Sequence, residues 1–163
     1  MTRCARCGKD LAEHEMDVGF QLPDVVWALA EQERAARAKY DSDLCVLDAE
    51  RYFLRGVLYL PVQGAHGNFG WGLWVEVSQA VFEHYVEIYS RDGRLERDAR
   101  GVLANTPAAY QDATHCAVAI RFGPATDRPV FVVEPGDHLL YREQHGGITL
   151  ERLHELVAPY RRE

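Results

Sequence analysis

Apolar and polar residues alternate along several short stretches in the middle of the chain. In residues 71–77, WGLWVEV, the odd-numbered positions share one face of an extended chain, and Gly72, Trp74 and Glu76 share the other. Short stretches rich in β-branched and aromatic residues predict further strands in residues 44–48, 52–62, 101–105, 114–122 and 129–135. The first two of these form a predicted hairpin, because only the polar residues 49–51 separate them.

A different spacing of apolar residues predicts helices. In residues 78–89, apolar side chains recur every three or four positions, and Ser78 stands where a helix N-cap is expected. The pattern also predicts helix in residues 22–40, broken into two short pieces, one or two turns in 137–147, and a final helix opened by Thr149.

This order of elements favours an α+β fold, because the strands cluster in the middle and the helices lie mainly at the ends. We expect a single central, mainly antiparallel sheet of about five or six strands, with helices packed on one face and an N-terminal CxxC knuckle. The chain shows no repeat and no linker, so residues 1–163 are expected to form a single domain. Within it, residues 1–21 form the metal-knuckle segment and residues 22–163 the α+β body.

Composition and charge limit the kinds of partner the protein is expected to bind and the cell compartment in which it is expected. The chain of 163 residues is 47% hydrophobic and 26% charged, as in globular proteins, and its net charge is -7 with a pI near 5.5. This charge disfavours binding to nucleic acids or to an anionic membrane surface. The N-terminus lacks the apolar core of a signal peptide, and no stretch approaches the ~20 apolar residues that span a bilayer. We therefore expect a cytoplasmic protein that binds a protein or small-molecule partner.

The CARCG segment at residues 4–8 is the sharpest local signal. Cys4 and Cys7 are separated by two residues, which lets both thiolates reach one metal ion, and zinc is the expected metal. Structural zinc takes four ligands, and His14 and Cys45 are predicted to complete the site, with Cys116 and His138 as alternatives. The competing interpretations are that the CxxC cysteines are unligated thiols and that Cys45 and Cys116 are small buried hydrophobes.

Other residues are candidates for a binding pocket. Trp71 and Trp74 lie on opposite faces of the predicted strand, so one is expected in the core and the other partly exposed, as a binding anchor or packed under a terminal helix. Arg55 interrupts an apolar strand and is expected to need a carboxylate partner, with Asp43 and Asp48 nearest in the chain. Such an arginine either forms a structural ion pair or recognises an anionic group.

The segment EPGDHLLYREQHGGI, residues 134–148, has the densest set of polar side chains. His138 follows Asp137 directly, and a histidine oriented by an aspartate performs acid–base chemistry in many enzymes. Adjacent residues seldom point at one another, so the stronger interpretation is that Asp137 caps a helical turn and His138 is a satisfied polar residue. The sequence contains no GxxxxGK[ST], HExxH or GxSxG motif, and no GxGxxG after a strand.

Taken together, these stretches resemble an uncharacterised, mainly bacterial family called domain of unknown function 2199. The resemblance is carried by CARCG, SDLCVLD, YFLRGVLYLPV, FGWGLWVEVS, RPVFVVEP and DHLLYREQHGGIT, in that order along nearly the whole chain. It implies no particular reaction. It does imply that motif positions are held by Cys4, Cys7, Asp43, Cys45, Arg55, Trp71, Trp74, Arg128 and His138.

Two classes of function follow from these features. The first is a non-catalytic binding or regulatory domain in which a zinc knuckle has a structural role. The second is a small metal-dependent, hydrolase-like enzyme in which Cys4, Cys7 and one further ligand leave a coordination position open for water. Four protein ligands would indicate the first class, and three with a water the second. A zinc-knuckle nucleic-acid binder fits least well, because the chain lacks a basic surface.

Overall fold

The computed structural model describes residues 17–64 and 67–160, and this part of the chain contains eight strands and five α-helices. The strands are β1 (Asp17–Gly19), β2 (Ala38–Tyr40), β3 (Leu44–Leu47), β4 (Arg51–Pro61), β5 (Asn68–Val77), β6 (Ala99–Leu103), β7 (Ala117–Arg121) and β8 (Val130–Val133). The helices are α1 (Asp24–Trp27), α2 (Glu31–Arg37), α3 (Gln79–Ile88), α4 (Leu139–Gly146) and α5 (Leu150–Val157).

Five of the strands close into a barrel. The pairs β4–β5, β5–β6, β6–β7 and β7–β8 are antiparallel, and β8 then pairs with β4. Four reversals of direction leave β8 running the same way as β4, so the closing pair is necessarily parallel. It is short: Val57 is opposite Val130, and the Val57 backbone N–H donates to the Pro129 carbonyl oxygen at 3.0 Å.

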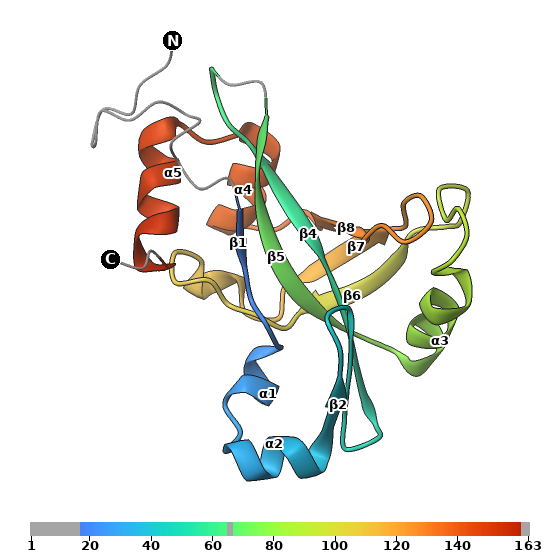
Figure 1. Cartoon of the computed structure of the whole chain (residues 1–163). Helices are drawn as coiled ribbons and strands as arrows, with labels where there is room; N and C mark the ends of the chain where they lie inside the picture. Colours follow the sequence, from blue (N-terminus) through green and yellow to red (C-terminus); the bar gives the residue numbers. More distant parts are fainter. Residues whose placement is uncertain (1–16, 65–66, 161–163) are drawn as a thin grey trace.

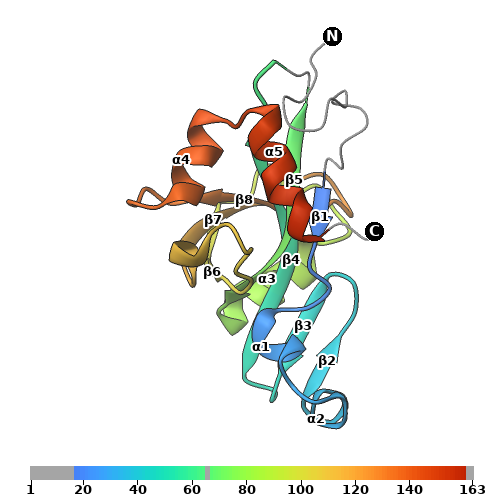
Figure 2. The ribbon, with the colours of Figure 1, turned by 90° about the vertical axis from the view of Figure 1, so that its left-hand side faces the viewer.

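The predicted open sheet with helices on one face is therefore wrong. The barrel closes because β4 and β5 are long and strongly paired to each other, so each can also pair with further strands along its free edge. Closure satisfies backbone groups that an open sheet would leave at its edges. The helices do not share one face either: α4 and α5 lie at one end of the β4–β5 hairpin, and α1 and α2 at the other (Figures 1 and 2).

The interior of the barrel contains the main hydrophobic core. Alternate residues of β4 and β5 point inward, and helices α3, α4 and α5 add apolar side chains from outside the strands. The largest fully buried side chains of this cluster are Trp71, Tyr110, Phe69, Phe131, Leu54, Leu58, Leu60, Leu73, Leu103 and Ile120. Gly56 also lies inside this layer, where the ring of Phe131 and the Pro129 carbonyl leave no space for a side chain.

A second, smaller cluster lies on the outer face of β4 and β5. Strands β3 and β2 extend the sheet beyond the barrel, and α1 and α2 lie beside this extension (Figure 1). The cluster contains Leu22, Val26, Ala38, Cys45, Leu47, Phe53 and Trp74. Because it receives the outward-facing residues of the same strands that line the barrel, β4 and β5 are buried on both faces in this region.

Most elements match the periodicity of the sequence. The hairpin of β3 and β4 and the strand β5 are confirmed. The two-piece helix predicted in residues 22–40 is confirmed up to Arg37 and is wrong for residues 38–40, which form β2. Ser78 and Thr149 are the N-caps of α3 and α5, and each side-chain oxygen accepts from a backbone N–H three residues on. The pattern missed β1 and β2, which are three residues long and pair at the ends of the sheet. In the described part of the chain, no helix has the length and apolar character needed to cross a bilayer.

Candidate functional site

The turn between β2 and β3 is the centre of the candidate site. The Asp41 side chain builds this turn, because its Oδ1 accepts from the backbone N–H groups of Asp43 and Leu44, both at 2.8 Å. The Asp43 carbonyl oxygen then accepts from the Arg55 backbone N–H at 3.0 Å, which ties the turn to β4. Two pockets open on either side of this turn.

The Asp43 carboxylate is held between two loops. Its Oδ1 accepts from Nε of Arg128 at 2.9 Å, and its Oδ2 accepts from the Ser42 hydroxyl at 3.0 Å. Arg128 lies between β7 and β8, so this ion pair connects residues that are 85 positions apart. The predicted pairing of Arg55 with Asp43 or Asp48 is not seen, because Asp43 pairs with Arg128 and Asp48 pairs with Arg37 at 2.8 and 2.7 Å.

The Arg55 guanidinium is consequently short of partners. Its hydrogen bond within the described residues goes from Nη1 to the Ser42 carbonyl oxygen at 3.5 Å, and its buried Nε has no partner there. Burial lowers the pKa of Arg55, the nearby positive charge of Arg128 lowers it further, and Asp43 offsets part of this effect. Arg55 therefore carries a positive charge that the surrounding residues compensate incompletely.

Two glycines make room for this guanidinium on the outer face of the sheet. A Cβ atom on Gly19 of β1 would lie 2.8 Å from Nη2 of Arg55, and one on Gly72 of β5 would lie 3.7 Å from it. The side chain thus runs from β4 across β5 towards β1. Any larger residue at Gly19 would displace it.

Arg55 lines the first pocket, which we call the arginine pocket. Its volume is ≈ 410 Å³, and it is lined by Gln21, Leu22, Trp27, Arg34, Tyr40, Asp41, Ser42 and Arg55. Trp27 and Tyr40 are 57% and 50% exposed, which is unusual for large aromatic side chains. Arg34 holds Trp27 in place. Its guanidinium carbon Cζ lies 4.9 Å from the centroid of the indole ring, and its N–H groups donate to three carbonyl oxygens of residues 26–29.

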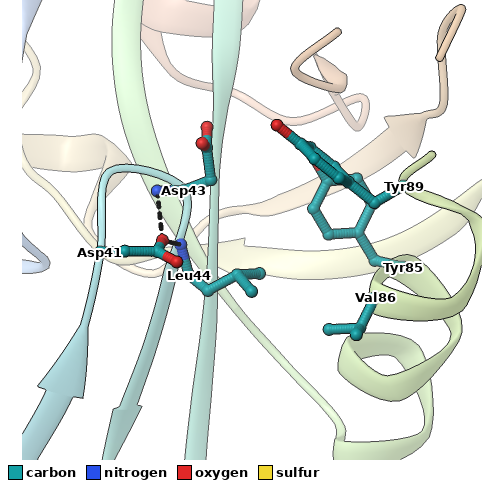
Figure 3. A pocket seen from close by; sticks show the side chains of 6 residues that line it. All are labelled: Asp41, Asp43, Leu44, Tyr85, Val86 and Tyr89. Carbon is teal, nitrogen blue, oxygen red and sulfur yellow. Dashed lines mark hydrogen bonds between the residues drawn. The ribbon is translucent and has the colours of Figure 1, made fainter. Parts of the chain in front are cut away.

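The second pocket, which we call the tyrosine pocket, lies between the same turn and α3. Its volume is ≈ 230 Å³, and it is lined by Asp41, Asp43, Leu44, Tyr85, Val86 and Tyr89. Figure 3 shows both tyrosine side chains pointing from α3 toward the turn. Tyr85 is 3% exposed, and its hydroxyl has no hydrogen-bond partner among the described residues. Burial raises the pKa of this hydroxyl, and the negative charge of Asp43 adds to the effect.

Of the predicted pocket residues, the structure brings Asp43 and Arg55 together and leaves the others elsewhere. Trp71 and Trp74 do lie on opposite faces of β5, but both are fully buried, in the barrel core and in the second cluster respectively. Trp74 also donates from its indole nitrogen to the Phe20 carbonyl oxygen at 3.0 Å. Both tryptophans thus contribute to packing, and the expected partly exposed side chain is absent from this strand.

His138 lies at the start of α4, away from both pockets. Its Nδ1 accepts from the Tyr141 backbone N–H at 3.2 Å, so His138 is the N-cap of this helix, where the sequence had suggested Asp137. Asp137 instead pairs with Arg142 at 3.1 Å. Both side chains are therefore engaged in the local structure of α4.

Only part of the predicted zinc site lies within the described residues. Cys4, Cys7 and His14 lie outside the described residues. Cys45 is fully buried in the second cluster, where burial raises the pKa of its thiol to about 11. Residues 17–64 and 67–160 contain no group of three histidine, cysteine or acidic side chains that could hold a metal ion. Zinc binding by the CxxC pair, with either a closed or an open coordination sphere, stays a prediction.

Several pocket residues were not identified from the sequence. Tyr85, Val86 and Tyr89 belong to the apolar stripe of α3, which predicts packing and gives no sign that one end of the stripe borders a pocket. Trp27 and Tyr40 stand in a segment that was interpreted only as helix. Asp41 is the one residue with a usable local signal, since aspartate commonly initiates a turn between two strands.

Comparison with known proteins places the chain in one family. A family model for an uncharacterised protein conserved in bacteria, DUF2199, matches residues 3–148. The chain belongs to this family. No curated protein matches the sequence, and no solved structure matches the fold. The family resemblance expected from the ordered motifs is thereby confirmed, and the family description assigns no activity.

Proposed function

We propose that this member of the DUF2199 family is a non-catalytic binding domain whose arginine pocket binds a small organic anion with a flat, apolar body. The observation that carries the proposal is the Arg55 guanidinium, which lines the pocket with most of its donors unused among the described residues. A guanidinium presents five N–H donors in a planar fork that matches a carboxylate or phosphate.

Charge favours an anion in this pocket. Among the described residues that line it, Arg34 and Arg55 are cationic and Asp41 is anionic, so these residues give it a positive formal charge. The lowered pKa of Arg55 reflects burial of its charge together with repulsion from Arg128. An anion bound against Arg55 would reduce both costs, because it supplies the opposite charge and accepts hydrogen bonds.

Shape favours a flat molecule. The volume of ≈ 410 Å³ falls within the range of roughly 300–1,000 Å³ that is typical of small-molecule pockets. Trp27 and Tyr40 are partly exposed at its rim, and aromatic side chains of this kind give large contact areas at little cost in conformational entropy. Because Arg34 already fixes the Trp27 ring, this side of the pocket is organised before a ligand arrives.

Benzoate and its neutral analogue benzamide test this proposal. In a titration followed by ¹H–¹⁵N correlation spectra, we expect benzoate to shift the indole N–H signal of Trp27, which Trp27→Phe identifies. Benzamide should bind at least about tenfold more weakly, since it lacks the charge. Arg55→Gln should lower the affinity for benzoate by about tenfold or more. Arg121→Gln is the matched control, because Arg121 is exposed, lies on β7 and pairs with Asp98 at 3.4 Å.

Two results would contradict the proposal. One is an equal affinity of Arg55→Gln and the parent protein for benzoate. The other is an equal response to benzoate and benzamide, which would show that the aromatic rim binds rings without regard to charge.

A further inference from the structure

We propose that the tyrosine pocket is a second binding site, separate from the arginine pocket, and that it takes a primary alkylammonium group. Two carboxylates, the buried hydroxyl of Tyr85 and an apolar floor meet in this pocket (Figure 3). The group that satisfies all of them carries a positive charge, several N–H donors and a short alkyl chain.

The Tyr85 hydroxyl is the most specific part of this site. Two neighbouring rings fix the Tyr85 ring. Phe122 stacks on it with ring centroids 5.9 Å apart, and Tyr89 packs edge-on with centroids 5.8 Å apart. A buried hydroxyl without a partner costs free energy, and buried polar groups that lack partners in native proteins call for an explanation. Because this oxygen has almost no accessible surface in the free protein, an ammonium N–H reaches it after a small shift of the side chains that cover it, and then supplies the missing hydrogen bond.

The carboxylates make the pocket favourable for a cation. Asp43 is partly neutralised by Arg128, whereas Asp41 forms its hydrogen bonds with backbone N–H groups and has no cationic partner among the described residues. Both Asp43 and Asp41 act on the Tyr85 hydroxyl in the direction that raises its pKa, and Arg128 opposes them. The rings of Tyr85 and Tyr89 add aromatic surface, which attracts cations.

The size and the remaining residues limit the ligand to a small group. The volume of ≈ 230 Å³ is below the range of roughly 300–1,000 Å³ that is common for drug-sized ligands. Leu44 and Val86 provide apolar surface for an alkyl chain. The same chemistry is presented by a free alkylamine and by the side chain of a lysine on a partner protein.

Butylammonium is the probe, and three comparisons define its recognition. We expect butylammonium to shift the amide signals of α3 and of residues 41–44 in ¹H–¹⁵N spectra. The neutral 1-butanol should bind at least about tenfold more weakly, because it lacks the charge. Tetramethylammonium has the charge but no N–H donors, so it should also bind more weakly. Equal binding of butylammonium and 1-butanol would overturn the proposal.

Variants locate the site. Asp41→Asn keeps the Oδ1 atom that accepts from Asp43 and Leu44, so the turn is preserved while the charge is lost. It should weaken butylammonium binding by about fivefold or more, whereas Asp137→Asn, with the same change in charge at an exposed position, should not. Tyr85→Phe should weaken binding as well. Unchanged affinity in both Asp41→Asn and Tyr85→Phe would overturn the proposal.

Two further measurements separate this site from the arginine pocket and identify the source of the amine. Trp27→Ala, which removes an aromatic side chain of the arginine pocket without a change in charge, should weaken benzoate binding and leave the affinity for butylammonium within about twofold of the parent value, because Trp27 does not line the tyrosine pocket. A loss of benzoate binding alone or of butylammonium binding alone therefore distinguishes the two proposals. If Nα-acetyl-lysine amide binds as tightly as butylammonium, the natural ligand is the lysine side chain of a partner protein. If Nα-acetyl-lysine amide does not bind, the natural ligand is a free alkylamine.

Discussion

Arg55 stands out among individual residues because its guanidinium is partly buried and has no carboxylate partner among the described residues. A buried ion that lacks compensation destabilises a fold, and side chains of this kind persist at positions where binding offsets their cost. The glycines at positions 19 and 72 keep the space that the guanidinium occupies. Asp43 compensates its charge only in part, because this carboxylate is paired with Arg128. Arg55 therefore lowers the stability of the free protein and is the main group that would bind an anion.

This reasoning predicts that Arg55→Met stabilises the protein. Methionine keeps the apolar stem on the sheet and removes the uncompensated charge, so the free energy of unfolding should rise by about 1 kcal/mol and the melting temperature by about 2–4 °C. Arg51→Met on the same strand is the control and should destabilise, because Arg51 donates to both carboxylate oxygens of Glu76, at 2.9 and 2.7 Å. Thermal unfolding followed by circular dichroism measures both changes, and a lower melting temperature for Arg55→Met contradicts this interpretation.

At the scale of secondary structure, α3 serves two purposes with one apolar stripe. Tyr85 and Ile88 are buried against the barrel, and Tyr85, Val86 and the C-cap residue Tyr89 border the tyrosine pocket. The helix is ten residues long, too short to be stable by itself, so its position depends on packing and on its cap. The Ser78 hydroxyl provides that cap by accepting from the Val81 backbone N–H at 3.2 Å.

Ser78→Ala should therefore cost about 1 kcal/mol in the free energy of unfolding, measured by urea denaturation. Ser78→Asp keeps an acceptor at the N-cap and should retain the parent stability or exceed it slightly. Thr149→Ala removes the corresponding cap of α5 and should cost a similar amount. A loss for Ser78→Ala that Ser78→Asp does not restore would mean that the hydroxyl contributes something other than capping.

At the scale of the whole molecule, the parallel contact between β4 and β8 closes the barrel. It rests on few interactions, including the hydrogen bond from Val57 to Pro129, and on close packing of Phe131 over Gly56. A Cβ atom at Gly56 would collide with the Phe131 ring and would lie 2.5 Å from the Pro129 carbonyl oxygen. The ring can move, but the carbonyl belongs to the backbone that forms the closing pair.

Gly56→Ala should thus be among the most disruptive single substitutions in the chain. We expect it to lower the free energy of unfolding by about 3 kcal/mol, because the collision must be relieved by parting β4 from β8. Gly146→Ala is the control, because a Cβ there meets no described atom within 4 Å apart from its chain neighbours and the backbone of its own helix, and alanine is favoured over glycine in a helix. Urea denaturation of both variants measures the effect. Equal stability of Gly56→Ala and the parent protein would mean that β4 and β8 are not in close contact in solution.

The sequence by itself determined most of the local elements of this protein, with β1 and β2 as the exceptions. Periods of two and of about 3.6 residues identify β4, β5 and α3, because side-chain direction along a strand or helix depends only on neighbours in the chain. The cap at Ser78 follows from the same local geometry. The ordered motifs also identified the family.

Tertiary structure alone decided the closure of the barrel and the position of the pockets. Val57 meets Val130, and Asp43 meets Arg128 85 residues later in the chain, and no periodicity records such long-range pairings. Closure brings the loop before β8 next to the turn before β3, where Arg128 pairs with Asp43, and Arg55 has no carboxylate partner within the part of the chain that the structure describes. The sequence therefore showed that Arg55 is an arginine in an apolar strand and needs a partner. Whether it forms an ion pair or faces a pocket depends on which strands come together.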